Sequence, residues 1–272
     1  MSRSRDIADS TKTLDVDGGT IKLDGNYPTG TGNVALGDTA LDSVAASGNN
    51  NTAVGSSAGT AITTGDNNTL IGSLAGDALD AGGNNVAIGY RALSAEDGHG
   101  TNIAIGSDAL KVQNAGTNAY NIAIGHDAGK AVTTGVKNTL IGGSAGDSLT
   151  TNGLNVAVGY GALSTEDTGS RNVAIGVSAL SSQNSDTTNY NVAVGYNSGA
   201  AITTGVQNTL IGGLAGDALT VGARNVALSA NALSTDTKGS YSIAIGYNSL
   251  FNQNFTTATE TYNTAVGYNT GA

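Results

Sequence analysis

The chain contains no cysteine and no tryptophan, and only one proline and two phenylalanines among 272 residues. The lack of cysteine excludes disulfide bonds and thiolate chemistry. The scarcity of large aromatic side chains excludes a globular core built on them. Positive charge is also scarce, since 11 Lys and Arg face 21 Asp and Glu, and the net charge of −10 disfavours binding to nucleic-acid phosphates. No apolar run approaches the roughly 18 residues of a membrane span, so no membrane insertion is expected.

A five-residue motif, Asn-(Val/Ile/Thr)-(Ala/Leu)-(Val/Ile/Leu)-Gly, recurs along almost the whole chain. It begins at Asn33, Asn51, Asn68, Asn85, Asn102, Asn121, Asn138, Asn155, Asn172, Asn191, Asn208 and Asn263, with near copies at Asn225 and Ser242. Successive starts are 17 to 21 residues apart, most often 17. This period is too short for repeats of paired helices and predicts a solenoid of short strands and turns. We therefore expect an all-β parallel solenoid of about 14 coils over residues 33–272.

A second period of 70 residues groups the coils in fours, as from Asn51 to Asn121 and from Asn121 to Asn191. Three coils of 17 are followed by a longer one, whose extra residues are predicted to leave the stack as a loop. Insertions in a solenoid lie on one side and often carry contacts. The candidate lateral contact residues, which could also be plain solvated turns, are Gln113, Asn114, Gln183, Asn184, Gln253 and Asn254.

Alternation along a strand places the second and fourth motif residues on one face and the third on the other. Because the fourth residue is always aliphatic, as in Ile105 and Ile175, we predict that it points into the coil. The third residue, usually Ala, is then predicted to allow close approach of a backbone segment or of a neighbouring chain. The glycine that follows suits a corner with positive φ.

The motif asparagines are predicted to form a structural ladder, because identical residues in stacked strands lie about 4.8 Å apart. A row of asparagines that binds a glycan is the alternative interpretation. One coil buries only a few small aliphatic groups, which at about 25 cal/mol per Å² barely offsets backbone ordering at about 1–2 kcal/mol per residue. Further burial between chains, as in a homotrimer, is therefore expected.

No catalytic, cofactor-binding or metal-binding residue set is predicted. His99 and His126 are the only histidines, and their spacing does not match a zinc motif. Glu96, Glu166 and Asp236 recur every 70 residues and are predicted to line one face as a file of carboxylates, about 19 Å apart. A glycosidase needs its carboxyl pair about 5–9.5 Å apart, so this spacing excludes that reaction. Glu96-Asp97 and Glu166-Asp167 could hold cations loosely.

The segments NVAIGYRAL at 85–93 and NVAIGVSAL at 172–180 resemble the head repeats of trimeric autotransporter adhesins. NTAVGYNTG at 263–271 is still more similar to repeat arrays of bacteriophage tail fibres. The resemblance covers about residues 33–272 and implies a left-handed parallel β-roll assembled as a parallel homotrimeric fibre. The period of 17 is longer than is usual for autotransporter head repeats.

Residues 1–32 are expected to form an attachment and capping segment, with a β-hairpin in the alternating stretch 13–24 around Gly18-Gly19. Residues 1–10 contain two arginines without an apolar run behind them, so no secretion signal is predicted. This favours a phage fibre over an exported adhesin. Residues 268–272 repeat the lead-in to a further coil, and we expect that the gene product continues or that another protein caps this end.

The sequence therefore predicts a non-catalytic structural fibre protein of a phage virion, a tail fibre or spike shaft involved in host-cell attachment. Its expected partners are two further copies of the chain, other virion proteins at the N-terminal segment, and a host surface glycan or protein at the distal end. One alternative is a bacterial surface adhesin or extracellular filament subunit. Another is an ice-binding solenoid. A flat ice-matching face would need threonines in every coil, whereas the threonine pairs of this chain, such as Thr63-Thr64, recur only every fourth coil.

Overall fold

The computed structural model describes residues 30–45 and 47–271, which form a parallel β-solenoid of about 14 turns with a period near 17. The chain divides into two compact units, Met1–Tyr120 and Asn121–Ala272. The described residues contain no helix, and hence none that could cross a membrane. The predicted hairpin at 13–24 and most of the predicted attachment segment lie outside the described residues. The all-β solenoid predicted from the repeats is confirmed.

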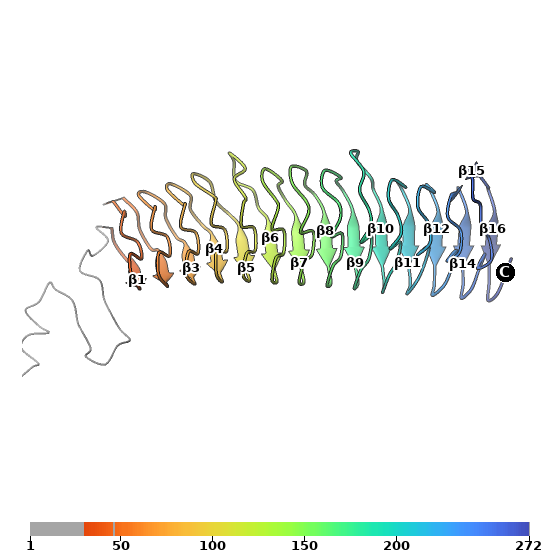
Figure 1. The fold of residues 1–272 in the computed structure, drawn as a ribbon, viewed down its shortest axis with the longest axis horizontal. Coiled ribbons are helices and arrows are strands. Elements are labelled where there is room, and N and C mark those ends of the chain that lie inside the picture. The colour runs from red at the N-terminus through yellow and green to blue at the C-terminus, as the bar shows by residue number, and fades with distance from the viewer. Residues whose placement is uncertain (1–29, 46, 272) are drawn as a thin grey trace, which may run out of the picture. The chain divides into compact units, whose positions relative to one another are not determined.

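Each coil contributes one strand of three residues, which begins directly after the motif asparagine (Figure 1). The first unit holds β1 (Val34–Leu36), β2 (Thr52–Val54), β3 (Thr69–Ile71), β4 (Val86–Ile88) and β5 (Ile103–Ile105). The second unit holds β6 (Ile122–Ile124), β7 (Thr139–Ile141), β8 (Val156–Val158), β9 (Val173–Ile175), β10 (Val192–Val194), β11 (Thr209–Ile211), β12 (Val226–Leu228), β14 (Ile243–Ile245) and β16 (Thr264–Val266), together with the short pair β13 (Gly239–Ser240) and β15 (Thr259–Glu260).

Within each unit, successive strands pair in parallel and equivalent motif residues face one another. Thr52 pairs with Thr69 across 17 residues, whereas Ile243 pairs with Thr264 across 21. The register is therefore kept when a coil is longer, and the extra residues leave the stack. Figure 1 shows the ribbon rising above its neighbours at the long coils that follow β5 and β9.

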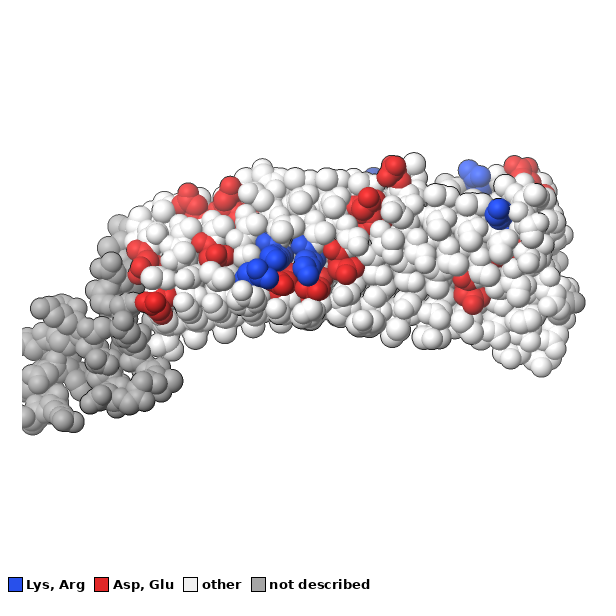
Figure 2. All heavy atoms as spheres, in the orientation of Figure 1, with Lys and Arg blue, Asp and Glu red and all other residues white. Residues whose placement is uncertain are grey.

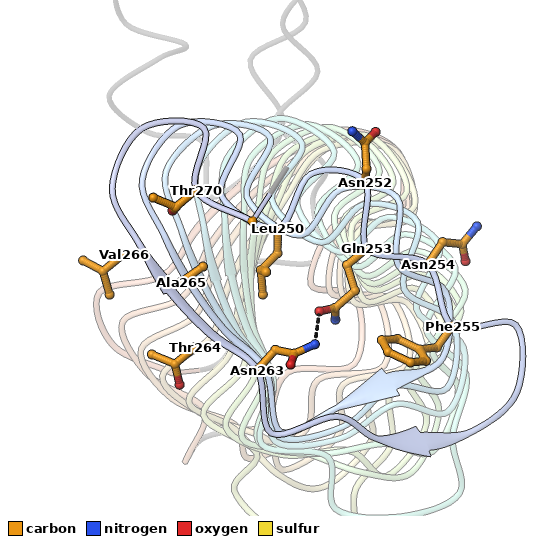
Figure 3. Close-up of a pocket in the computed structure, with 11 residues that line it drawn as sticks. Leu250, Asn252, Gln253, Asn254, Phe255, Asn263, Thr264, Ala265, Val266 and Thr270 are labelled. Atoms are coloured by element: carbon orange, nitrogen blue, oxygen red, sulfur yellow. Dashed lines mark hydrogen bonds between the residues drawn. The ribbon is translucent and has the colours of Figure 1, made fainter.

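The strand faces are inverted relative to the sequence prediction. The middle residue of each strand is fully buried in almost every coil, as in Ala53 and Leu70. The fourth motif residue lies outside instead, and Ile211 is 42% exposed. Figure 3 shows the same on β16, where Ala265 points inward and Val266 outward. The predicted alternation along the strand is right, but the inward-pointing and outward-pointing residues were exchanged. The coil is so narrow that its inner strand face has room for alanine, but not for an isoleucine in every turn.

Larger side chains reach the core from the turn that follows each strand. Counted from the motif asparagine, the ninth residue is Gly in the first two coils of a 70-residue group and Leu in the next two. The twelfth residue is Ile, Val or Leu in the first two coils and an acid or Gln in the next two. A Cβ on Gly76 would lie 2.8 Å from both Leu70 Cδ2 and Leu79 Cδ1. Glycine therefore makes room for two leucines, and the packed volume stays nearly constant between coils.

The glycine after each strand forms the corner of the coil. Gly55 has a φ of 139°, and a Cβ there would lie 2.6 Å from the carbonyl carbon of Gly72 in the next coil. The corner therefore requires glycine both for its backbone conformation and for the close stacking of coils, as predicted. Ser229 occupies this corner in one coil and has a φ of 118°.

Candidate functional site: an outer strand face, a buried ladder and protruding loops

The first and third residues of the strands form a surface that we name the outer strand face. In the second unit it comprises Ile122, Ile124, Thr139, Ile141, Val156, Val158, Val173, Ile175, Val192, Val194, Thr209, Ile211, Val226, Leu228, Ile243, Ile245, Thr264 and Val266. These side chains are half-buried or exposed, and none of those on the described strands of this face is charged. In several coils an exposed tyrosine directly follows the corner glycine and extends the face, as in Tyr160 and Tyr196 at 67% and 60% exposure.

The motif asparagines lie inside the coil and are buried from Asn51 to Asn225. Asn208 shows the pattern: its Nδ2 donates to the carbonyl of Gly222 at 2.9 Å, and its Oδ1 accepts the N–H of Asn225 at 3.0 Å. The side chain thus closes its own coil and connects it to the next one. Direct amide-to-amide bonds, which the predicted ladder implies, occur from Asn68 to Asn51 and from Asn85 to Asn68. Asn33 is half-buried, and Asn263 is exposed. Burial leaves the central asparagines inaccessible to a glycan.

The glutamines predicted to lie in protruding loops are the last core residues before those loops. Gln113 and Gln183 are fully buried at the twelfth position of their coils, so the prediction of lateral contacts is wrong for both. Gln183 Oε1 accepts from Asn191 Nδ2 at 2.9 Å, which ties the long coil to the next asparagine. The neighbouring Asn114, Asn184 and Asn254 are exposed, as predicted for loop residues.

Each loop ends on an exposed tyrosine directly before the next motif asparagine. Tyr120, Tyr190 and Tyr262 are 54%, 52% and 66% exposed, and all three have positive φ. The Tyr262 ring also stacks on that of Tyr241, with centroids 5.2 Å apart. The sequence prediction missed these residues, although the 70-residue recurrence of the first two could have revealed them.

The carboxylates predicted to line one face as a file lie inside the coil. Glu96, Glu166 and Asp236 are fully buried at the twelfth position, where the third coil of each group carries an acid. Glu166 Oε1 accepts the N–H of Gly169 at 2.6 Å and that of Ser185, in the protruding loop, at 3.3 Å. These acids therefore anchor the base of each loop.

Burial raises the pKa of the Glu166 carboxyl above its ordinary value, and its hydrogen bonds with Gly169, Ser185 and Asn189 partly oppose the shift. Desolvation also raises the pKa of Glu96, against the N–H groups of His99 and Ala115. Among the described residues, Glu96, Asp97 and His99 form one group whose potential ligand atoms lie within 4.8 Å of one another.

At the last described coil, a hollow of about 700 Å³ is lined by residues at core positions, such as Leu250 and Gln253, and by exposed residues, such as Asn252 and Asn254 (Figure 3). Leu250, Gln253 and Asn263 point into it, and Asn263 Nδ2 donates to Gln253 Oε1 at 2.7 Å. These side chains hold the same coil positions as buried residues elsewhere, so the hollow is the open end of the described core.

Most of the face drawn in Figure 2 is uncharged, with scattered acidic groups and one cluster in which Lys and Arg side chains lie against acidic ones. Ion pairs are local, such as Arg91 Nε with Asp108 Oδ1 at 3.0 Å and Lys130 Nζ with Asp127 Oδ2 at 3.1 Å. Both pairs are half-buried at the surface, where an ion pair contributes about 0–1 kcal/mol. Hydrogen bonding and apolar packing, rather than charge, therefore dominate the stability of the coils.

Comparison of the chain with family models, with curated proteins and with solved structures finds no match.

Proposed function

We propose that this chain is a structural fibre protein that assembles as a homotrimer through its outer strand face and serves host attachment in a phage virion. The observation that carries the assembly is the uncharged, half-exposed row of Val, Ile, Leu and Thr side chains along the strands. The resemblance of its repeats to phage fibre arrays supports the number of chains and the virion location. The exposed tyrosines and loop residues offer surfaces for a host glycan or protein.

Apolar patches larger than a few hundred Å² on a soluble protein mark interaction surfaces. Fully burying one Val, Leu or Ile side chain contributes about 1.5–3 kcal/mol. Nine strands of the second unit each present two side chains of this face. Even partial burial of so many groups between copies is large beside the small net stability of a folded domain, about 5–15 kcal/mol.

The assembly is tested by light scattering of the full chain. Three chains of 26.7 kDa correspond to a particle of about 80 kDa. Ile175→Asp places a charge on the outer strand face and is expected to yield the monomer mass, because burying an unpaired carboxylate between copies costs several kcal/mol. Asn184→Asp, which adds the same charge on an exposed loop, is the matched control and is expected to keep the trimer mass. A monomeric wild-type chain, or a trimer unaffected by Ile175→Asp, contradicts the assembly.

The virion location is tested with antibodies raised against the full chain. Labelling of purified phage particles in electron micrographs, together with detection of the chain by mass spectrometry of those particles, is the expected result. Labelling of a bacterial cell surface without particles contradicts it and favours the adhesin alternative.

A further inference from the structure

A buried acid occurs in three copies of the 70-residue group, as Glu96 in the first, Glu166 in the second and Asp236 in the third. In the second and third copies both carboxylate oxygens have hydrogen-bond partners. Glu166 Oε2 accepts from Asn189 Nδ2 at 2.9 Å, while its Oε1 accepts two backbone N–H groups. Asp236 Oδ2 accepts from Gln253 Nε2 at 2.6 Å, while its Oδ1 accepts the N–H groups of Gly239 and Phe255 at 3.0 Å. The shared arrangement is a carboxylate whose second oxygen is held by a side-chain amide.

The first copy departs from this arrangement. Glu96 Oε1 accepts the N–H of His99 at 3.2 Å, but its Oε2 is buried without a hydrogen-bond partner among the described residues. The position of Asn189, 70 residues earlier, is Ala119, so the amide donor is missing. The position of Gly169 is His99, whose Nδ1 is also buried and has no hydrogen-bond partner in the described part of the chain.

The two changes belong together. A Cβ on Gly169 would overlap Asn189 Nδ2 and the carboxyl group of Glu166. A histidine at this position therefore requires the asparagine amide and the acid to shift, and in the first copy Ala119 leaves no asparagine amide there. In the first copy an imidazole takes the place of the amide donor, and a carboxylate oxygen of Glu96 and the ring Nδ1 of His99 are both buried without a hydrogen-bond partner among the described residues.

We propose that Glu96, Asp97 and His99 bind one divalent transition-metal ion of the Zn²⁺ class. His99 Nδ1 lies 3.9 Å from Glu96 Oε1, and ligand atoms of all three residues lie within 4.8 Å of one another. Two ligands at about 2.1 Å from a tetrahedral zinc ion lie about 3.4 Å apart, so small side-chain rotations that draw the three groups together complete the set. Imidazole with carboxylates suits Zn²⁺ rather than Ca²⁺, and water can take the fourth position.

The ion would fix the carboxylate that contacts the first protruding loop. Glu96 also accepts a hydrogen bond from the backbone N–H of Ala115 in that loop. In the second copy the equivalent loop is fixed to Glu166 by Asn189 as well. None of the three proposed ligands lies in the loop, so bound metal would act on the loop only through Glu96.

The first experiment is titration of the full chain with ZnCl₂ by calorimetry. One Zn²⁺ per chain is expected. His99→Gly, which installs the residue of the second copy, is expected to weaken binding at least tenfold, whereas His126→Gly removes the other histidine and leaves binding unchanged. No saturable binding, or binding that follows His126 rather than His99, overturns the proposal.

A second measurement separates metal binding from folding. Hydrogen exchange of residues 96–100 is expected to slow when Zn²⁺ is added to the wild type and to stay fast in His99→Gly. The double variant His99→Gly with Ala119→Asn rebuilds the second copy and is expected to protect the loop at residues 113–119 without metal and to bind no Zn²⁺. Exchange of residues 96–100 that is independent of Zn²⁺ in the wild type overturns the proposed site.

Discussion

Ser229 stands at the corner where every other coil carries glycine, with a φ of 118° that non-glycine residues rarely adopt. A strained backbone conformation of this kind costs about 1–3 kcal/mol. Ser229→Gly is therefore expected to raise the free energy of unfolding by about 1 kcal/mol, measured by urea denaturation. Gly195→Ser makes the reverse change at a corner with a φ of 141° and is expected to be destabilising. A lower stability of Ser229→Gly would show that the serine makes a compensating contact.

Glu166 determines part of the dependence of stability on pH. Its folded-state pKa is raised above the ordinary glutamate value of 4.5, so the folded chain holds the proton more tightly than the unfolded chain. Stability from this group is therefore greatest below pH 4.5 and is lost as pH rises towards the raised pKa. Glu166→Gln stays neutral, and its unfolding free energy is expected to fall less than that of the wild type between pH 4 and 7. Parallel curves for the two proteins would contradict the shift.

At the scale of the element, each coil depends on its asparagine. Asn208→Ala leaves the carbonyl of Gly222 and the N–H of Asn225 without their side-chain partner. An unsatisfied buried group costs about 1–3 kcal/mol, so a loss of about 2–5 kcal/mol is expected in thermal or urea unfolding. Asn184→Ala, on an exposed loop, is the control and is expected to change stability by less than about 0.5 kcal/mol. Equal effects of the two substitutions would contradict the structural role of the ladder.

The repeat spacing was enough to predict the coils, because one asparagine per turn sets the register. Side-chain size alone could not predict which face of the strand is buried. Ile105 is larger than Ala104, yet Ala104 is buried, because the leucines that fill the core come from the turn, as Leu110 does. Gln113 was misplaced for the same reason. It lies just before an insertion and is polar, but it occupies the twelfth position of its coil, which faces the core.

The sequence prediction named Glu96-Asp97 as residues that could hold a cation loosely, but it did not include His99, whose role depends on Ala119, 20 residues later. Neither residue is informative alone. Alignment of the chain with itself at 70 residues would have paired them with Gly169 and Asn189, but only the geometry shows that a Cβ at the glycine position meets the asparagine amide.

For the whole molecule, the outer strand face links stability to association. If copies bind through it, the folded trimer is favoured by mass action, and the melting temperature is expected to rise with protein concentration. Ile175→Asp is expected to flatten that dependence, and Asn184→Asp to preserve it. Calorimetric scans over a hundredfold range of concentration provide the measurement, and a constant melting temperature in the wild type would contradict assembly through this face.

The grouping of coils in fours makes the length of this protein adjustable in fixed steps. Tyr120-Asn121 and Tyr190-Asn191 are the same junction, and the core residues that follow them at the ninth and twelfth positions repeat in the same order. Deleting residues 121–190, or inserting a second copy of them, therefore joins a coil to the same kind of coil that follows it in the original chain. Recombination between such segments would lengthen or shorten the array by four coils at a time without creating a new core.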